Sequence, residues 1–559
     1  QVSLSSSTVF DNPYKYLDMH SKFATGVQPY TPDNNPYPGG QLIIDEGSSG
    51  GAGPELDKGY KAIQWNSPLD ENGNPIPTEL VSYPNNMADF VQTGITSTNG
   101  VAISNGNDVM TYRLGFTNMS SRGLIPNSDL FRNNLTLSSS AKATKKLTIS
   151  SNININRTWS NNRPAGNRGT NPLQAAFDVS PHININELKD YWMPGQEGLQ
   201  QRSQSIGDFN NPYFLAYEIN NSYERDRVFG NLKADYQITP ELSITGTYTL
   251  DYYNEIRQTK GANSYTKSEN GIFGVTNILS YERNTDILAT YSKNFGDFGL
   301  SISAGGNARY NNGNNVLNSS SGAGLVVPGV FTLSNIPSSS LQYSSNMYQR
   351  AINSAYGIAN LSYNDIVYLD ITARNDWSST LPKANNSYFY PSLSLSVLAN
   401  EMFDMGSNVN MLKLRGGWAQ VGNDANPYSL YPTLGNSGQW NGVSRLGVSG
   451  TLLTPNLKPE IANSYEFGLD LGMFNNRLRF EGTYYTIDNK NQILSGIGLP
   501  SSSGYDKVNV NAGLIRSKGW ELMIGGTPIQ KSNGFSWDVS VNVSRNRTKI
   551  IELTEGIER

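Results

Sequence analysis

The sequence contains no cysteine and only two histidines, His20 and His182, among its 559 residues. The absence of cysteine excludes a disulfide framework and any thiolate metal site. Both histidines fall in segments predicted to be loops, and nothing beside His182 suggests the orienting carboxylate that a Ser-His-Asp arrangement requires. We therefore expect exposed loop histidines, a protein that is not an enzyme, and no required cofactor.

Charge and long apolar runs are also scarce. Charged residues make up 16% of the chain and the formal net charge is -4, so the sequence shows no basic footprint for nucleic acid. No run of about 18 apolar residues exists, which excludes a membrane-spanning helix but leaves a membrane-spanning β-barrel open. Residues 1–10 are strand-like and no signal peptide precedes them, so we expect the numbering to begin inside a longer precursor.

The residues that are abundant point to strands. Asn, Ser, Gly and Tyr are spread evenly, and apolar residues recur at every second position over long stretches. In residues 535–545 the apolar set is Phe535, Trp537, Val539, Val541 and Val543, with polar residues between them. Side chains on a strand point to opposite faces in turn, so each such strand has one apolar and one polar face. This pattern suits a sheet between lipid and water.

Turn residues divide these strands into hairpins. Four hairpins are predicted around Pro240, Gly296-Asp297, Asn364-Asp365 and Asn475-Asn476. Long connections are expected near 11–88, 160–221, 312–349, 379–388 and 424–461. Short turns alternating with long loops are typical of outer-membrane barrels, in which the long loops face outward. The predicted fold class is therefore all-β: a large antiparallel transmembrane β-barrel, with about 18 strands in this chain.

Two smaller features accompany this pattern. A short helix is expected within residues 170–192, where Leu173, Ala176 and Phe177 recur at helical spacing. Aromatic residues near strand ends are predicted to form girdles at the membrane interfaces, although the preference of Tyr for strands explains them as well. The girdle candidates are Tyr236, Tyr252, Tyr253, Tyr291, Tyr310, Phe474, Tyr484 and Tyr485.

Several strings then carry a resemblance, in order along nearly the whole chain. They are GPELDKG at 53–59, RNDWSS at 374–379, YPSLSLS at 390–396, LKLRGGWAQVGN at 412–423, LKPE at 457–460 with SYEFGLD at 464–470, and NAGLIRSKGWEL at 511–522. Each string is short, but together they are fairly specific. On them the chain resembles a TonB-dependent receptor of the SusC/RagA family.

The resemblance implies a barrel of about 22 strands, an N-terminal plug domain, and a SusD-like surface lipoprotein as a lid over the outer mouth. It also implies uptake of oligosaccharides or peptides, energised through the TonB complex, in contact with outer-membrane lipid. The chain departs from the family pattern because no plug or TonB box precedes residue 1 and no closing strand ends in an aromatic residue. We therefore expect residues 1–559 to be a partial barrel domain that lacks the plug and the C-terminal strands and cannot close by itself.

Two other functions stay open beside the importer. A passive large porin predicts a precursor without a plug and steady leakage through reconstituted channels. A surface β-rich adhesin or glycan-binding protein predicts extraction without detergent, and it explains poorly why apolar faces run along so many long strands. The choice between glycan and peptide as substrate also stays open, with glycan ahead on family frequency alone.

The candidate site residues are few. Loop aromatics are predicted to contact substrate or lid, although packing between loops explains each one equally well. These aromatics are Trp65, Trp192, Trp377, Tyr428, Tyr431 and Trp440. The segment with Asp70, Asn72 and Asn74 resembles a calcium loop but lacks the bidentate Glu of such sites, so a plain Asn-Gly turn is preferred and structural calcium is the alternative.

Overall fold

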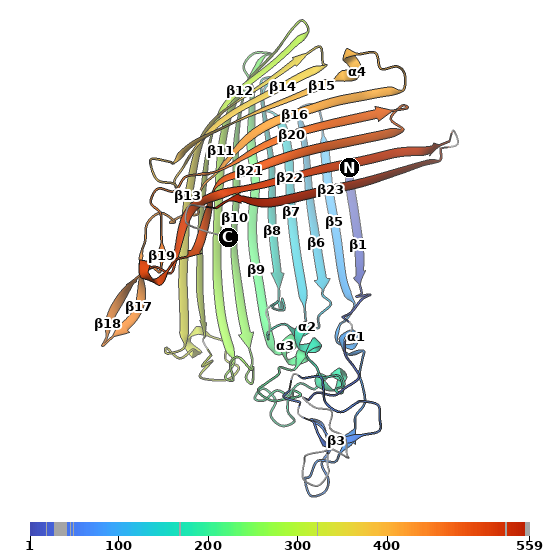
Figure 1. Ribbon diagram of the computed structural model, residues 1–559, viewed down its shortest axis with the longest axis vertical. Helices are drawn as coiled ribbons and strands as arrows, with labels where there is room; N and C mark the ends of the chain where they lie inside the picture. The colour runs from blue at the N-terminus through green and yellow to red at the C-terminus, as the bar shows by residue number, and fades with distance from the viewer. Residues whose placement is uncertain are drawn as a thin grey trace.

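A computed structural model describes residues 1–17, 19–26, 42–44, 46–48, 50–166, 169–320, 322–531 and 534–553. It consists mainly of an 18-stranded sheet (Figure 1). The first half of this sheet contains β1 (Val2–Asp11), β5 (Gly94–Gly106), β6 (Met110–Arg122), β7 (Asp129–Lys142), β8 (Leu147–Ser160), β9 (Ile219–Gln237), β10 (Leu242–Gly261), β11 (Ile272–Phe295) and β12 (Phe298–Ser320). The second half contains β13 (Leu341–Tyr363), β14 (Val367–Ser378), β15 (Ser387–Leu398), β16 (Val409–Asn423), β19 (Thr451–Leu452), β20 (Glu460–Met473), β21 (Leu478–Gly498), β22 (Lys507–Gln530) and β23 (Ser536–Glu552).

The sheet is an antiparallel meander. Every strand except the short β19 pairs with its neighbours in chain order, and β19 adds a two-residue parallel pairing to β22. In the described registers β1 pairs only with β5, and β23 pairs only with β22. The sheet is therefore curved but not closed, as expected, and the predicted strand number is confirmed.

Alternation along each strand gives the sheet one apolar and one polar face. In the β9–β10 ladder, Leu232 lies opposite Tyr248 and Val228 opposite Tyr252, all on the apolar face. Three residues beyond Leu232, Asp235 lies opposite Thr245 on the polar face. A one-residue slip would exchange the two faces, so the apolar pattern fixes the register. We call the apolar side the outer face and the polar side the inner face.

The four predicted hairpins are present at the short-turn end of the sheet. Asn364 and Asp365 both have positive φ values, 52° and 57°, and Asn475 and Asn476 have 57° and 60°. Asn and Asp tolerate this left-handed backbone better than other residues with a side chain, which is why these pairs occupy tight turns. Pro240, which has no amide hydrogen, lies in the turn between β9 and β10, outside the ladder.

The long connections gather at the opposite end of the strands, at the bottom and left of Figure 1. The predicted loop 312–349 is shorter than expected, because β12 continues to Ser320 and β13 begins at Leu341. Small elements occupy the loops. They are β2 (Leu42–Ile43), β3 (Lys61–Ile63), β4 (Thr78–Glu79), α1 (Asn86–Phe90), α2 (Pro172–Phe177), η2 (Ile185–Lys189), α3 (Pro212–Glu218), η3 (Leu333–Asn335), β17 (Leu434–Trp440), β18 (Val443–Val448) and η4 (Ser501–Ser503); α4 (Ala399–Met402) lies between β15 and β16.

The helix predicted within 170–192 is present as α2, and η2 follows it. Asn171 caps α2 by accepting a hydrogen bond from the Leu173 amide, and Pro172 occupies its first turn. Together with α1 and α3, these elements form a small buried core at the loop end. Its central residues are Phe90, Ile183, Ile185, Leu188 and Tyr213.

The residues predicted to form aromatic girdles divide between the two faces of the sheet, and their place at the membrane interface stays a prediction. Tyr236, Tyr252 and Tyr484 lie on the outer face and are 46%, 38% and 47% exposed. Tyr253 and Tyr485 instead lie on the inner face, because their ladder partners Arg227 and Gly519 belong to it. Adjacent residues on a strand point to opposite faces, so only one tyrosine of each pair, Tyr252-Tyr253 and Tyr484-Tyr485, can face outward. None of the described helices has the length and apolarity to span a membrane.

Candidate functional site

The inner face carries Arg-carboxylate pairs that link neighbouring strands. The pairs that join different strands of the first half are Arg225 with Glu255, Arg227 with Asp251, and Arg309 with Glu282. In the second half, Arg415 pairs with Asp470, and Arg350 pairs with Asp424 just beyond β16. Arg227, Arg309 and Arg350 each contact both oxygens of their carboxylate, the two-bond geometry that favours one register between strands. Each of the five pairs leaves little unbalanced charge.

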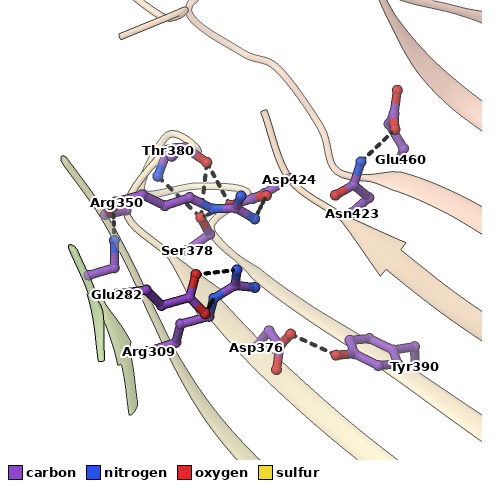
Figure 2. Close-up of polar contacts among 12 residues, drawn as sticks. Glu282, Arg309, Arg350, Asp376, Ser378, Thr380, Tyr390, Asn423, Asp424 and Glu460 are labelled. Carbon is purple, nitrogen blue, oxygen red and sulfur yellow. Dashed lines mark hydrogen bonds and ion pairs between the residues drawn. The ribbon is translucent and has the colours of Figure 1, made fainter. Parts of the chain in front are cut away.

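The pair of Arg350 and Asp424 is the best-connected part of this network (Figure 2). The Asp424 side chain is 1% exposed, and its Oδ2 accepts a hydrogen bond from Thr380 Oγ1 at 2.8 Å. Ser378 Oγ also donates to Asp424, and Arg350 Nε approaches the same oxygen at 3.1 Å. One carboxylate therefore ties together β13, the end of β14 and the long loop that follows β16.

A second cluster lies on β14 and β15. Asp376 accepts hydrogen bonds from Arg374 Nε at 2.8 Å and from the Tyr390 hydroxyl at 2.6 Å. Arg374 also donates to Ser354 Oγ at 2.7 Å, and its guanidinium lies 5.4 Å from the Tyr356 ring centroid. The string RNDWSS, which carried part of the resemblance, thus supplies both charges of this cluster.

At the loop end the network continues across β16 and β20. Asn423 Nδ2 donates to Glu460 Oε2 at 3.0 Å, and Glu460 Oε1 accepts the Ile493 amide at 2.8 Å. Tyr388 stacks on Tyr390 with ring centroids 5.9 Å apart, and a Cβ atom at position 422 would overlap the Tyr388 ring. Glycine at 422 is therefore required for this ring to lie flat against the wall.

This arrangement offers a polar surface of hydroxyls, amides and mutually paired charges. Such a surface makes many weak hydrogen bonds to a polar solute without holding one charge tightly. Among the described residues, no group of three or more His, Cys, Asp or Glu side chains is arranged to hold a metal ion. The sequence did not predict the network, because the five Arg-carboxylate pairs that link different strands join residues at least 24 positions apart.

The candidate calcium loop folds as a turn. Asp70 Oδ1 accepts the amides of Asn72 and Asn74, both at 2.8 Å, and Gly73 has a φ of 81°. These hydrogen bonds, first of all the one from the Asn74 amide, lower the pKa of Asp70. Its oxygens thus serve as turn acceptors, the arrangement expected of an Asx turn.

One of the two histidines differs from the prediction of exposed loop residues. His182 is buried, 3% exposed, within the loop core, and its Nε2 lies 3.7 Å from Glu46 Oε1. The apolar neighbours Ile183 and Ile185 belong to the same core, and the burial arises because distant loop segments pack together there. His20 is exposed and stacks on Phe23 with ring centroids 5.5 Å apart.

Burial in the loops also affects three tyrosines. Burial raises the pKa of Tyr191 to about 12, and the neighbouring Glu218 carboxylate, which accepts its hydroxyl hydrogen bond at 3.0 Å, adds to the effect. Burial likewise raises the pKa of Tyr213 and Tyr265 to about 12. These hydroxyls therefore stay neutral donors at any physiological pH.

The sequence matches a model of the "TonB dependent receptor-like, beta-barrel" family over residues 147–553. The chain belongs to this family. Its members are outer-membrane proteins, so the outer face contacts lipid and the inner face lines the lumen. Long loops of such barrels lie outside the cell, which places the loop end at the extracellular mouth.

Curated relatives carry the same family assignment. TonB-dependent receptor P3 of Formosa agariphila is 26% identical over 545 residues, which cover 92% of this chain and 53% of the relative. TonB-dependent receptor SusC of Bacteroides thetaiotaomicron is 24% identical over 515 residues, 87% of this chain and 50% of the relative. The chain thus spans about half the length of these relatives. They confirm the predicted resemblance to the SusC/RagA receptors.

Solved structures agree on the fold. The RagAB peptide transporter superposes with a TM-score of 0.73 at 20% identity, covering 85% of this chain and 53% of that chain. The same transporter in its open-open state gives a TM-score of 0.72 at 19% identity, covering 84% and 52%. At this level of identity the likeness concerns the barrel fold.

Within this TonB-dependent receptor barrel, the predicted loop aromatics fall into three groups. Trp65 and Trp192 pack within the loop core: the Arg202 guanidinium lies 4.7 Å from the Trp65 ring centroid, and Trp192 meets Phe214 edge to face at 5.3 Å. Trp377 is not a loop residue. It lies in β14 on the outer face, 43% exposed, because it alternates with the inner-face Asp376.

The third group lies in the long loop 424–459 at the mouth. Tyr428, Tyr431 and Trp440 are 62%, 65% and 68% exposed. Trp440 ends β17, which pairs with β18 as a separate two-stranded hairpin projecting at the left of Figure 1. Sequence reasoning placed these three correctly in a loop, and their contact with substrate or lid stays a prediction.

Proposed function

We propose that this chain is the barrel wall of an active nutrient importer, part of a longer protein with a plug, energised through the TonB complex. The observation that carries the proposal is the inner face: a polar surface with oppositely charged pairs between strands, behind an apolar outer face. Membership of the TonB-dependent receptor barrel family supports this proposal over the passive porin. The wall itself is proposed to bind and guide, with no enzymatic step and no cofactor.

The proposed substrate is a polar oligomer, an oligosaccharide first and a peptide as the alternative. At the mouth the charges of Arg350, Asp424 and Asp376 are already balanced by neighbouring groups. A neutral, hydroxyl-rich chain exchanges hydrogen bonds with such a wall at little electrostatic cost, whereas charged peptide ends need counter-charges. RagAB, which shares the barrel fold of this chain, is a peptide transporter, and peptide is therefore the alternative cargo.

The proposed partner at the mouth is a SusD-like surface lipoprotein that closes over the loops. The exposed Tyr428, Tyr431 and Trp440 supply the kind of aromatic surface that anchors protein partners or stacks on sugar rings. Their position on one loop beside the buried Asp424 means that the wall network holds the base of that loop.

The test uses the full-length protein, solubilised in detergent from outer membranes and examined for copurifying partners and bound ligand by mass spectrometry. A copurifying lipoprotein with a trapped oligosaccharide supports the importer and names its cargo class; a trapped peptide selects the alternative cargo. A lone barrel with constitutive conductance in planar bilayers contradicts the importer and supports the porin. Extraction without detergent would support the adhesin.

A loop variant sharpens this test. The double substitution Y428A/W440A is expected to reduce the copurified lipoprotein or ligand about tenfold, since a buried aromatic anchor contributes roughly 1.4 kcal/mol or more at an interface. Tyr14→Ala is the matched control, because Tyr14 is 98% exposed in the first long loop and belongs to no aromatic cluster proposed for contact. Equal yields from both variants would contradict a role for this loop.

A further inference from the structure

The outer face of β21–β23 changes character in steps toward the extracellular mouth. Ladder partners form rows across the three strands, and two residues along a strand advance about 6.6 Å. From near the short-turn end of β21 toward the mouth, successive rows are Phe480, Ile524 and Val541; Gly482, Leu522 and Val543; Tyr484, Trp520 and Arg545; Thr486, Lys518 and Arg547; Asp488, Arg516 and Lys549. The face is thus apolar, then aromatic, then cationic. We call Arg516, Lys518, Arg545, Arg547 and Lys549 the basic patch.

The order of these rows fixes the depth of the basic patch. Trp and Tyr of membrane proteins gather at the boundary between hydrocarbon and headgroups. Tyr484 and Trp520 occupy that boundary here, with apolar rows on the lipid side of them and cations on the other. The basic patch therefore lies at headgroup depth, beside the outer leaflet.

Two ladder pairs within the basic patch bring like charges together. Lys518 lies directly opposite Arg547, and Arg516 lies directly opposite Lys549. Like charges in this position destabilise an antiparallel pair. An anion bound between these cations would remove the repulsion.

Little within the chain balances this charge. Asp488 is the one carboxylate in these outer-face rows, and it is engaged by Arg516 through two hydrogen bonds of 2.6 and 2.7 Å. Within the described ranges, no ion pair joins Lys518, Arg545, Arg547 or Lys549 to an acidic group. The side chains of the patch, with Tyr484, Trp520 and Ile551, line a groove of about 400 Å³.

Another part of the outer face shows the contrast. On β8 and β9, Arg157 lies opposite Asp226 and also pairs with Glu224, so two carboxylates meet one cation. The cation on these two strands is therefore balanced by acids, unlike the cations of the basic patch.

We propose that the basic patch binds the phosphate groups of an anionic lipid in the outer leaflet, with the acyl chains of that lipid against the apolar rows below. Arg and Lys donate several charge-assisted hydrogen bonds to phosphate oxygens, and Arg does so in a fixed fork. The groove between Trp520 and Lys549 receives the headgroup, and the aromatic row covers its junction with the hydrocarbon. This lipid site holds the wall at one depth and one orientation in the membrane.

The experiment uses the full-length protein in detergent, incubated with vesicles of phosphatidylcholine containing either bis-phosphorylated lipid A or its dephosphorylated form. Retained lipid is counted by native mass spectrometry after re-isolation. We expect retention of the phosphorylated lipid only, and about 30-fold weaker retention by K518Q/R547Q, because each Lys or Arg near an anionic surface contributes roughly fivefold in affinity. K142Q/K145Q is the matched control: it removes the same charge at the short-turn end and should retain the lipid.

The other outcomes contradict the proposal in distinct ways. Equal retention of phosphorylated and dephosphorylated lipid means that the acyl chains alone bind. Full displacement by millimolar inorganic phosphate at constant ionic strength means that the groove takes small phosphates and no lipid. Unchanged retention by K518Q/R547Q, with the barrel still folded by its heat-dependent gel mobility, places the lipid elsewhere.

Discussion

The two faces of this wall use charge in opposite ways. On the inner face, the buried Asp424 carboxylate accepts hydrogen bonds from Arg350, Ser378 and Thr380, so its charge is balanced within the protein. On the outer face, Lys518 and Arg547 oppose each other across a ladder with no acid between them. Paired charges stabilise a wall, whereas unpaired like charges lower its stability and so point to something bound. A charged residue with hydrogen-bonding partners inside the protein has a structural role. A charged residue without such partners is a candidate for binding a ligand.

The largest expected change in the free energy of unfolding comes from placing a charged side chain on the lipid-facing side of a strand. Val541→Arg places a cation among the apolar outer rows and should lower the free energy of unfolding in lipid vesicles by about 2–4 kcal/mol. Ser540→Arg, one residue away on the inner face, should change it by less than about 1 kcal/mol, because the lumen is wet. Denaturant titration of the full-length protein in vesicles measures both. Equal losses would overturn the assignment of the faces.

A smaller effect is expected from breaking an inner-face pair. Asp424→Ala leaves the Arg350 guanidinium and two hydroxyls without their acceptor and should cost roughly 2–3 kcal/mol, since removing one member of a buried pair is destabilising. The base of the loop 424–459 should become sensitive to protease. Glu481→Gln, an exposed inner-face carboxylate, serves as the control and should change neither quantity. A stable, protease-resistant D424A variant would mean that the network does not hold this loop.

The smallest effect is the most informative about the outer face. Lys518→Glu converts a like-charge ladder pair into an opposite-charge pair and should stabilise the barrel by about 0.2–1 kcal/mol. The same change should abolish lipid retention if the basic patch binds phosphate. Arg157→Glu is the reverse control, because it places three acids together on β8 and β9 and should destabilise the barrel slightly. A destabilised K518E variant would show that the repulsion is already relieved within the protein.

The sequence by itself determined the alternation of faces, the hairpins and the approximate number of strands. A strand has a side-chain period of two, so the positions of Val539, Val541 and Val543 are enough to assign a face without knowledge of the partner strand. The turns at Asn364-Asp365 and Asn475-Asn476 follow from local backbone preference in the same way. The long loop with Tyr428 and Trp440 was likewise evident from the missing alternation.

Only the tertiary structure decided which residues meet across strands. The inner pairs and the basic patch join positions such as Arg350 with Asp424 and Lys518 with Arg547, whose proximity depends on ladder registers and on the paths of loops. The burial of His182, the packing of Trp65 and Trp192 and the outward orientation of Trp377 also depend on segments distant in sequence. The local sequence pattern determines the face of each side chain, because successive residues of a strand point to opposite sides. Which side chains contact each other is decided only when the sheet fixes the order and register of its strands.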